Sequence, residues 1–243
     1  MRQYIYGKNT VLESLKGSQP VHQVYMMRNM KDEKIIALAK KKNTKIQFIS
    51  SKNELTALVG KVVHQGVVAE VEAYQYVSLT DIIHSIPQGK QPLLLMLDGL
   101  EDPHNLGAIL RTCDAIEVDG VIIGKNRSVG LTSTVAKVST GAIDHVKVAQ
   151  VTNLSRTLED LKKQGYWVVG CDLDNSQDYR TIDYNMPVVI VIGSEGFGIS
   201  HLVKKHCDMN VVLPMHGHVT SLNASVATAV ILYQVYNSRH PFR

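Results

Sequence analysis

The clearest signal for the fold is the segment MPVVIVIGSEGFGIS, residues 186–200. Residues 188–192 are apolar and mostly β-branched, which predicts a strand buried on both faces of a sheet. Three glycines follow this strand before a polar, amphipathic run begins: Gly193, Gly196 and Gly198. A strand that ends in a glycine-rich turn is typical of nucleotide-binding loops. Glu195 stands among these glycines, however, where a loop that cradles phosphate avoids a carboxylate.

Five further apolar stretches of the same region predict strands, and helical patterns separate most of them. They are residues 93–97, 120–123, 145–151, 166–171 and 209–213. Near-continuous apolar strands that alternate with helices favour an α/β fold with a parallel or mostly parallel sheet, covered on both faces. We predict one such domain over residues 93–243. In sheets of this kind ligands bind at the carboxyl ends of the strands, so we expect the chemistry in the turns that follow them.

The first part of the chain predicts a separate small α/β domain over residues 1–75. Its expected helices are residues 8–17, 32–43 and 51–60, and its expected strands are residues 21–27, 45–50 and 66–74. A short helical pattern then leads into QGKQP, residues 88–92, a polar stretch with glycine and proline. We therefore predict a linker over residues 76–92.

The positive charge of the chain is concentrated in this small domain. The whole chain has a net charge of +4, yet residues 1–75 carry 12 Lys and Arg against 6 Asp and Glu, a net charge of +6. A basic module beside a slightly acidic one favours binding of a polyanion such as RNA. The lysine-rich run at residues 40–45 is equally consistent with a solvated helix end.

Composition excludes several classes of protein. No apolar run approaches the roughly 18 residues that a membrane span needs, and the first residues lack the apolar core of a signal peptide. We therefore expect a cytoplasmic protein with no membrane partner. The three cysteines, Cys113, Cys171 and Cys207, form no C-x-x-C pair, so neither a disulfide framework nor a zinc ribbon is predicted. The histidines lack Glu or Cys partners at diagnostic spacing, so we predict no metal site.

Polar residues mark three turns that follow predicted strands. DGLEDPHNLGAILRTCDA, residues 98–115, contains Asn105 and Arg111, and the turn after residues 188–192 contains Glu195. PMHGHVTSLNASVATAV, residues 214–230, contains Ser221 and Asn223. Taken singly, these residues also have structural interpretations, as helix caps or as a surface charge.

Taken together, NLGAILRTCDA, IGSEGFGIS and LPMHGHVTSLNASVATAV, in this order and at these spacings, resemble the three motifs of the SpoU (TrmH) family of RNA ribose 2′-O-methyltransferases, in the SPOUT superfamily. YGKNTVLESLK near the start and HQGVVAEV at residues 64–71 resemble the small substrate-binding domain of the rRNA-modifying branch. The resemblance covers nearly the whole chain and is greatest to the RlmB-like branch, which methylates a guanosine of 23S rRNA.

The resemblance implies features that general rules would not predict. Its members fold the C-terminal domain as an α/β knot, a mostly parallel sheet with a deep trefoil knot, although knots are otherwise essentially absent from proteins. The small N-terminal domain is expected to be L30e-like. Members are homodimers whose active sites take residues from both chains. The apolar helix expected over residues 225–236 is consistent with a dimer helix and equally with a helix of a monomer core.

The resemblance also implies the cofactor, S-adenosyl-L-methionine (AdoMet). Backbone atoms around Gly193, Leu213 and Leu222 are expected to hold it, with Gly170 and Cys171 close by. AdoMet has no phosphate and carries a positive sulfonium. A loop that binds it needs close backbone approach, which glycine permits, and a nearby carboxylate is then tolerable.

The catalytic candidates that the resemblance implies are Asn105, Arg111, Glu195, Ser221 and Asn223. Methylation of a ribose 2′-hydroxyl requires positioning of the oxygen and removal of its proton. A guanidinium has a pKa above about 12 and is a donor, which suits a general base poorly. We therefore expect Arg111 to grip the phosphate beside the target ribose and to stabilise the developing alkoxide. The proton would leave to that phosphate, to water or to a neighbouring side chain.

The leading functional hypothesis is methylation of a guanosine in ribosomal RNA. A tRNA ribose methyltransferase is the alternative within the same class, although tRNA-acting relatives usually rely on basic extensions rather than on this small domain. An RNA-binding ribosome-assembly factor without catalysis is the alternative of a different class. A nucleotide-dependent oxidoreductase is disfavoured, because the glycines follow the order G-x-x-G-x-G late in the sheet.

Overall fold

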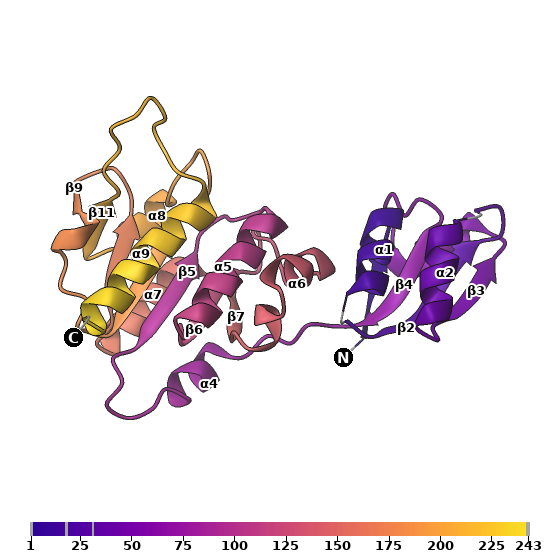
Figure 1. Ribbon diagram of the computed structural model, residues 1–243, viewed down its shortest axis with the longest axis horizontal. Helices are drawn as coiled ribbons and strands as arrows, with labels where there is room; N and C mark the ends of the chain where they lie inside the picture. Colours follow the sequence, from indigo (N-terminus) through magenta and orange to yellow (C-terminus); the bar gives the residue numbers. More distant parts are fainter. Residues whose placement is uncertain (1, 18, 31, 242–243) are drawn as a thin grey trace. The chain divides into compact units, whose positions relative to one another are not determined.

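The computed structural model describes residues 2–17, 19–30 and 32–241, and the chain divides into two compact units. The first comprises Met1–Tyr74 together with Leu131–Lys137, and the second comprises Gln75–Gly130 and Val138–Arg243. Each unit contains its own β-sheet (Figure 1).

The first unit is built on a four-stranded sheet of order β1-β4-β2-β3. Strand β4 pairs antiparallel with β1 and β2, whereas β2 and β3 are parallel. The strands and helices are β1 (Arg2–Tyr6), α1 (Lys8–Lys16), β2 (Val21–Met27), α2 (Glu33–Lys41), β3 (Lys45–Ile49), α3 (Lys52–Val59) and β4 (Val67–Glu72). The expected elements are present, and β1 is an additional edge strand that the sequence did not predict.

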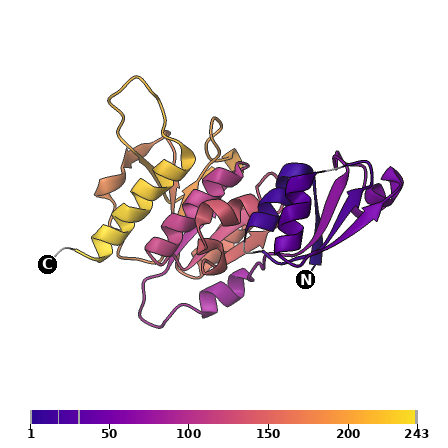
Figure 2. The same cartoon turned by 45° about the vertical axis from the view of Figure 1, so that its right-hand side comes forward.

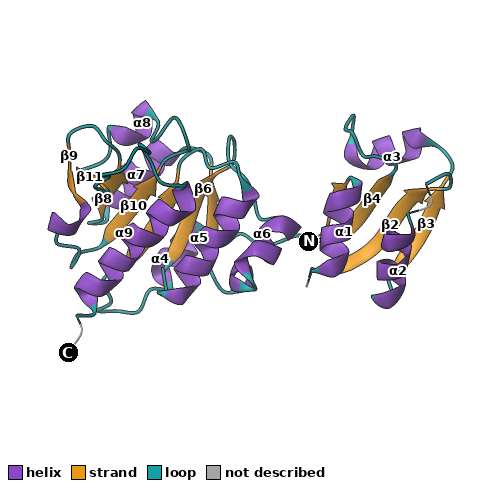
Figure 3. Cartoon of the chain, turned by 45° about the horizontal axis from the view of Figure 1, so that its top comes forward, coloured by secondary structure: helices purple, strands orange, loops and turns teal. Residues whose placement is uncertain are grey.

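Local signals explain where these helices begin. Asp32 precedes α2, and its side chain accepts a hydrogen bond from the backbone N–H of Ile35. Ser51 precedes α3 and forms a reciprocal capping box with Glu54. Figure 3 shows α1 and α2 lying against the sheet. Buried apolar side chains of both helices pack there in one core: Val11, Leu15, Ile35 and Ala39, against Val24, Met26 and Val67.

The second unit contains a seven-stranded sheet of order β7-β6-β5-β10-β8-β11-β9, and all its strand pairs are parallel. The strands are β5 (Leu93–Leu97), β6 (Gly120–Gly124), β7 (Val148–Val151), β8 (Trp167–Cys171), β9 (Ser176–Asp178), β10 (Val188–Ile192) and β11 (Met209–Val212). The prediction of a mostly parallel α/β sheet is confirmed. The short edge strand β9 was not predicted, because SQD lacks an apolar run.

Helices cover both faces of this sheet. They are α4 (Leu79–His84), α5 (Pro103–Ala115), α7 (Leu154–Lys163), α8 (His201–Lys204) and α9 (Ala224–Arg239), with 3₁₀ turns at Ala142–Asp144 and Tyr179–Thr181. Helix α6 (Ser133–Ser139) falls mostly within the segment Leu131–Lys137 of the first unit. Helices α5 and α9 lie side by side on one face (Figure 2). On the other face, fully buried Ile82 of α4 and Leu158 and Leu161 of α7 pack against alternate residues of the strands. No helix of the described residues is long and apolar enough to cross a membrane.

The strand order creates a switch point between β5 and β10. From β5 the chain runs outward to β6 and β7, and it then crosses to β8 on the far side of β10. Leu97 and Ile192 end the two central strands in register, and the backbone N–H of Asp98 donates to the carbonyl of Ile192 at 2.9 Å. The turns after β5 and β10 therefore emerge together, at the position where open parallel sheets bind ligands.

Candidate active site

Helix α5 positions Asn105 beside this switch point. The carboxylate of Asp102 caps the helix by accepting a hydrogen bond from the N–H of His104 at 2.8 Å, and Pro103 occupies the first turn, where no N–H partner is needed. Asn105 follows in the same turn and is only 5% exposed. A buried amide needs partners for its oxygen and its nitrogen, so its surroundings determine its orientation.

The glycine loop after β10 folds back on itself. Ser194 and Gly198 exchange two backbone hydrogen bonds of 3.0 and 2.9 Å. Gly196 and Gly198 have φ of +90° and +65°, a region that favours glycine. A Cβ on Gly193 would lie 2.0 Å from the carbonyl carbon of Gly198. The internal geometry of the loop thus already requires these glycines, and the loop presents Glu195 at its turn.

Three segments meet in one hydrogen-bond network. Oε1 of Glu195 accepts from Nδ2 of Asn105 at 3.1 Å, from Nδ2 of Asn223 at 2.7 Å and from the backbone N–H of Ala224 at 3.1 Å. Nδ2 of Asn223 also donates to Oδ1 of Asn105 at 2.9 Å. Asn105, Glu195 and Asn223, predicted from three separate motifs, are therefore in direct contact.

Helix ends reinforce this network. Asn223 is the N-cap of α9, and its Oδ1 accepts from the backbone N–H groups of Ser225 and Val226. Both α5 and α9 thus direct their N-terminal turns toward Glu195, where partial positive charge favours a carboxylate. All three donors reach Oε1, and Oε2 accepts no hydrogen bond from the described residues. One carboxylate oxygen therefore holds the loops together while the other is available to a ligand.

Arg111 lies on α5 but outside the network. It is exposed and makes no hydrogen bond or ion pair with any described residue. Six residues separate it from Asn105, which places the two side chains roughly 120° apart around the helix axis. The structure therefore does not bring Arg111 into contact with Glu195 or Asn223 within one chain.

Ser221 and Leu222 lie in the long loop of residues 213–223, between β11 and α9 (Figure 1). Both are exposed, and Ser221 makes no hydrogen bond with a described residue. Leu213 begins the same loop and is half-buried. This loop reaches the network only at its end, through Asn223.

Gly170 and Cys171 end β8, beside β10 and β11. A Cβ on Gly170 would lie 2.8 Å from Sγ of Cys207 and 2.9 Å from Oδ1 of Asn210, so this glycine allows close packing inside the sheet. Burial, together with the carboxylate of Asp172, raises the pKa of the Cys171 thiol to about 11. Cys171 is therefore an uncharged thiol at neutral pH.

The structure also contains a cleft that the sequence did not predict. Its volume is about 650 Å³, and it is bordered by the turns after β5, β6 and β10. Asn105 and Glu195 line it together with Glu101, Asn126, Arg127 and Phe197. The only signal in the sequence was the position of these residues directly after strands. No group of three or more His, Cys, Asp or Glu able to hold a metal ion occurs among the described residues.

Family models match both parts of the chain. The SpoU rRNA Methylase family model matches residues 92–233. The model described as RNA 2′-O ribose methyltransferase substrate binding matches residues 4–77. The network of Asn105, Glu195 and Asn223 lies within the first match.

Individual proteins give the same result. The chain is 50% identical over 242 residues to YacO of Bacillus subtilis (strain 168), whose name places it in the TrmH family of tRNA/rRNA methyltransferases; the match covers 98% of this chain and 96% of YacO. The crystal structure of an AdoMet-bound rRNA methyltransferase from Sinorhizobium meliloti is similar, with a TM-score of 0.64, 24% identity and coverage of 100% and 88%. The SpoU methyltransferase AviRb from Streptomyces viridochromogenes, in complex with AdoMet, also has a TM-score of 0.64, at 23% identity and coverage of 98% and 90%.

The two solved structures share the fold, and the family model and YacO establish the relationship in sequence. With three family motifs meeting at the switch point of its parallel sheet, the chain belongs to the SpoU (TrmH) family of RNA 2′-O-methyltransferases.

Proposed function

We propose that this protein transfers a methyl group from AdoMet to the ribose 2′-hydroxyl of a guanosine in 23S ribosomal RNA, as an enzyme of the RlmB-like branch acting in the cytoplasm. The observation that carries the proposal is the hydrogen-bond network of Asn105, Glu195 and Asn223, which joins the family's three motifs at one edge of the sheet.

The residues present suit AdoMet. Leu213 and Leu222 offer apolar surface, and the loop of residues 213–223 that carries them has no regular secondary structure, so its backbone groups are available to an adenine and a ribose. Glu195 adds a carboxylate, which a positive sulfonium tolerates. We assign the cofactor to this loop and to the loop at Gly193, with Gly170 and Cys171 close by. When bound, AdoMet supplies an activated methyl group.

The protein's own residues position the ribose and assist removal of the proton from its 2′-hydroxyl. Asn105 and Asn223 are held in one orientation by Glu195, so the network is organised before the substrate arrives. The free Oε2 of Glu195 accepts a hydrogen bond from the substrate, and Ser221 supplies a further neutral hydrogen bond. Arg111, which has no partner of its own, binds the phosphate next to the target ribose and stabilises the developing alkoxide. The proton leaves to that phosphate or to water.

The proposed active form is a homodimer. On α9, Val226, Val230 and Tyr233 are 47%, 36% and 44% exposed and share one side of the helix. An exposed apolar stripe of this kind favours a partner. Arg111 has no hydrogen-bond partner within its own chain. In the homodimer we expect it to act at the hydrogen-bond network of the second chain, because members of the family build each active site from residues of both chains. We assign the proposed trefoil knot to the segment from β10 to α9. The hydrogen bonds of Glu195 with Asn223 and Ala224 support this assignment, because they hold the loop after β10 against the start of α9.

The small N-terminal domain is proposed to bind the RNA. Its family match to a substrate-binding module and its net charge of +6 over residues 1–75 support this role. A tRNA substrate is the second candidate, because the name of YacO includes both tRNA and rRNA.

One experiment separates these possibilities. The protein is incubated with radiolabelled AdoMet and, separately, with deproteinised rRNA, deproteinised tRNA and pre-ribosomal particles, and ribose methylation is then mapped. We expect label at one guanosine of 23S rRNA. Label in tRNA alone supports the tRNA alternative. Failure to label any RNA contradicts the enzymatic proposal and favours a ribosome-assembly factor.

A further inference from the structure

The cleft next to the catalytic network has firmly held walls. The carboxylate of Asp98 accepts from the backbone N–H of Ser200 at 2.7 Å, and the backbone N–H of Val129 donates to the carbonyl of Leu100 at 2.8 Å. These bonds join the turns after β5, β6 and β10 to one another. Gly99, with φ of +74°, lets the first of these turns reverse its direction. The cleft is therefore formed before any ligand enters, as is usual for small-molecule sites.

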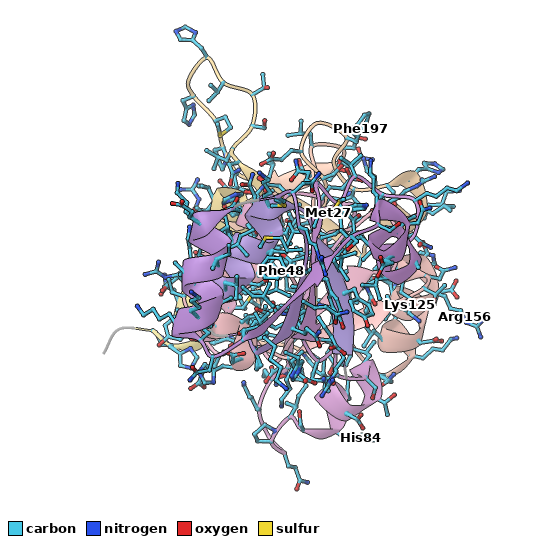
Figure 4. All side chains as sticks on the ribbon, turned by 90° about the vertical axis from the view of Figure 1, so that its right-hand side faces the viewer. Met27, Phe48, His84, Lys125, Arg156 and Phe197 are labelled. Carbon is cyan, nitrogen blue, oxygen red and sulfur yellow. The ribbon has the colours of Figure 1, made fainter. Side chains whose placement is uncertain are left out.

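One wall of the cleft carries an exposed aromatic ring that is not packed in the protein core. Phe197 lies in the glycine loop, lines the cleft and is 95% exposed. It points outward at the end of its loop (Figure 4). A phenylalanine exposed to this extent gains nothing for folding. Exposed aromatic rings beside RNA sites serve as platforms on which unstacked bases stack.

The remaining polar groups complement the edges of a base. Among the carboxylates of the turn after β5, those of Asp98 and Asp102 accept backbone N–H groups, whereas that of Glu101 makes no hydrogen bond with a described residue. In the turn after β6, the side chains of Asn126 and Arg127 also line the cleft, are exposed and are likewise without partners among the described residues. Arg127 has φ of +52°, a conformation that costs energy for a residue with a Cβ and that occurs preferentially at functional sites.

This set of groups favours guanine. The Watson–Crick edge of guanine presents two adjacent donors, N1–H and the N2 amino group, which match the two oxygens of a free carboxylate. Its O6 and N7 are acceptors, which match an arginine or an asparagine amide. Uracil and cytosine present fewer donors side by side, and adenine presents its amino group next to an acceptor.

We infer that the cleft binds the flipped-out base of the target nucleotide, that this base is guanine, and that Phe197 stacks on it while Glu101 reads its donor edge. Asn105 and Glu195 line the same cleft and belong to the network, so a base held here brings its own ribose to the catalytic groups. Glu101, Asn126 and Arg127 are then specificity residues, and this inference rests on the proposed function.

Direct binding tests the inference without methyl transfer. Trp167 is the only tryptophan in the chain, so the double variant Trp167→Phe, Phe197→Trp carries a single tryptophan at the cleft. With AdoMet present, we expect GMP to quench its fluorescence at concentrations about tenfold lower than AMP, CMP or UMP. Adding Glu101→Gln removes this preference, whereas adding Glu117→Gln, an exposed glutamate outside the cleft, preserves it. Equal quenching by all four nucleotides, or unchanged preference in Glu101→Gln, overturns the assignment.

Kinetics on RNA provide the second arm. In the RNA identified by the mapping experiment, inosine replaces the target guanosine and removes the N2 amino group. For the wild type, we expect kcat/KM on the inosine RNA to be about tenfold lower than on the guanosine RNA. For Glu101→Gln, we expect kcat/KM to be nearly the same on the two RNAs. Phe197→Ala is expected to raise KM, and Phe197→Tyr is expected to restore it. Leu202→Ala, an exposed apolar control, is expected to leave KM unchanged.

If the wild type methylates RNA but Glu101→Gln discriminates against inosine as the wild type does, the base assignment fails while the proposed function stands. If no RNA is methylated, the proposed function fails whatever GMP does.

Discussion

At the scale of single residues, Glu195 and Arg111 differ in how many hydrogen bonds they make within the chain. Glu195 accepts three N–H donors on one oxygen, whereas Arg111 makes no hydrogen bond or ion pair with any described residue. A residue with three partners supports the local structure as well as any ligand, because its loss leaves donors unpaired. A residue without partners can be removed at little structural cost.

The first prediction follows for Arg111→Ala. Surface substitutions away from packed or bonded features change stability by about 0.5 kcal/mol or less, so we expect the melting temperature and AdoMet affinity to stay near those of the wild type. Methyl transfer is expected to fall below detection. Calorimetric titration with AdoMet and a methyl-transfer assay check this prediction. Equal loss of both properties would show that Arg111 is structural.

The second prediction concerns Asn223→Ala. This change removes the N-cap of α9 and two hydrogen bonds of the network, so we expect a loss of roughly 1–2 kcal/mol in the free energy of unfolding. Activity and part of the AdoMet affinity should fall with it. Ser78→Ala, which removes the N-cap of α4 and does not line the cleft, is the matched control and should lower stability only. Unchanged turnover in Asn223→Ala would exclude this residue from the site.

The third prediction concerns the thiols. Burial, reinforced by Asp172, raises the pKa of Cys171 and Cys207 to about 11, and burial raises that of Cys113 further. A raised thiol pKa disfavours the reactive thiolate at pH 8. A thiol-exchange reagent should therefore react slowly with the folded protein at pH 8, faster as the pH approaches 11, and at once with all three cysteines in denaturant. Rapid reaction of a folded thiol at pH 8 would contradict the burial seen here.

At the scale of elements, the site is made of strand ends and helix starts whose geometry leaves little freedom. The loop after β10 closes through the bonds between Ser194 and Gly198, and α9 is anchored at its other end by Arg239. The guanidinium of Arg239 donates to four backbone carbonyls, those of Tyr184, Met186, Gln91 and Pro92. Helix α9 is thus held at both ends, at Asn223 and at Arg239.

The fourth prediction is that Gly193→Ala disrupts the glycine loop. The new Cβ would lie 2.0 Å from the carbonyl carbon of Gly198, and because that obstacle is backbone, the loop must move and release Glu195. We expect a loss of about 1–3 kcal/mol in stability together with loss of AdoMet binding. Gly217→Ala, where a Cβ meets nothing within 4 Å, should leave the melting temperature unchanged. A Gly193→Ala protein with wild-type stability and cofactor affinity would show that the loop adapts.

At the scale of the whole molecule, the apolar stripe of α9 remains uncovered in a single chain. One side of the helix is buried through Ile231, Leu232 and Val235, and the other side exposes Val226, Val230 and Tyr233. The helix is therefore apolar almost all round, which is why its sequence was consistent with both a core helix and a dimer helix. The structure shows one side buried within the chain and leaves the other for the proposed partner.

The fifth prediction is that the double variant Val230→Asp, Tyr233→Asp is a monomer. Two carboxylates in an apolar interface lose their hydration without a partner, so light scattering should give half the mass of the wild type, with an unchanged circular dichroism spectrum. Methyl transfer should fall if Arg111 serves the partner's network. Leu202→Asp, an exposed apolar position on α8, should keep the mass of the wild type. A double variant that keeps this mass would place the interface elsewhere.

Most strands and helices of the second unit, and the residues of its three motifs, were predictable from the amino-acid sequence. Residues 188–192 and 93–97 were recognisable because parallel strands buried on both faces need unbroken apolar runs. Asn105, Glu195 and Asn223 became candidates because their three motifs together resemble those of the SpoU family, whereas each residue taken singly also has a structural interpretation. Elements without such a signal, the edge strands at Arg2–Tyr6 and Ser176–Asp178, were missed, since pairing with a neighbouring strand defines them.

The contacts among these residues became visible only in the folded chain. The donors on Glu195 come from segments 90 and 28 residues away, and no local pattern encodes contacts over such distances. The structure also shows that the glycines are required by the conformation and close packing of their own loop. It places Arg111 outside the network, and it contains a cleft that Phe197 and Glu101 line together with Asn105. Local propensity and periodicity act over a few residues, whereas a site is made by strand order, and strand order depends on the packing of the whole sheet.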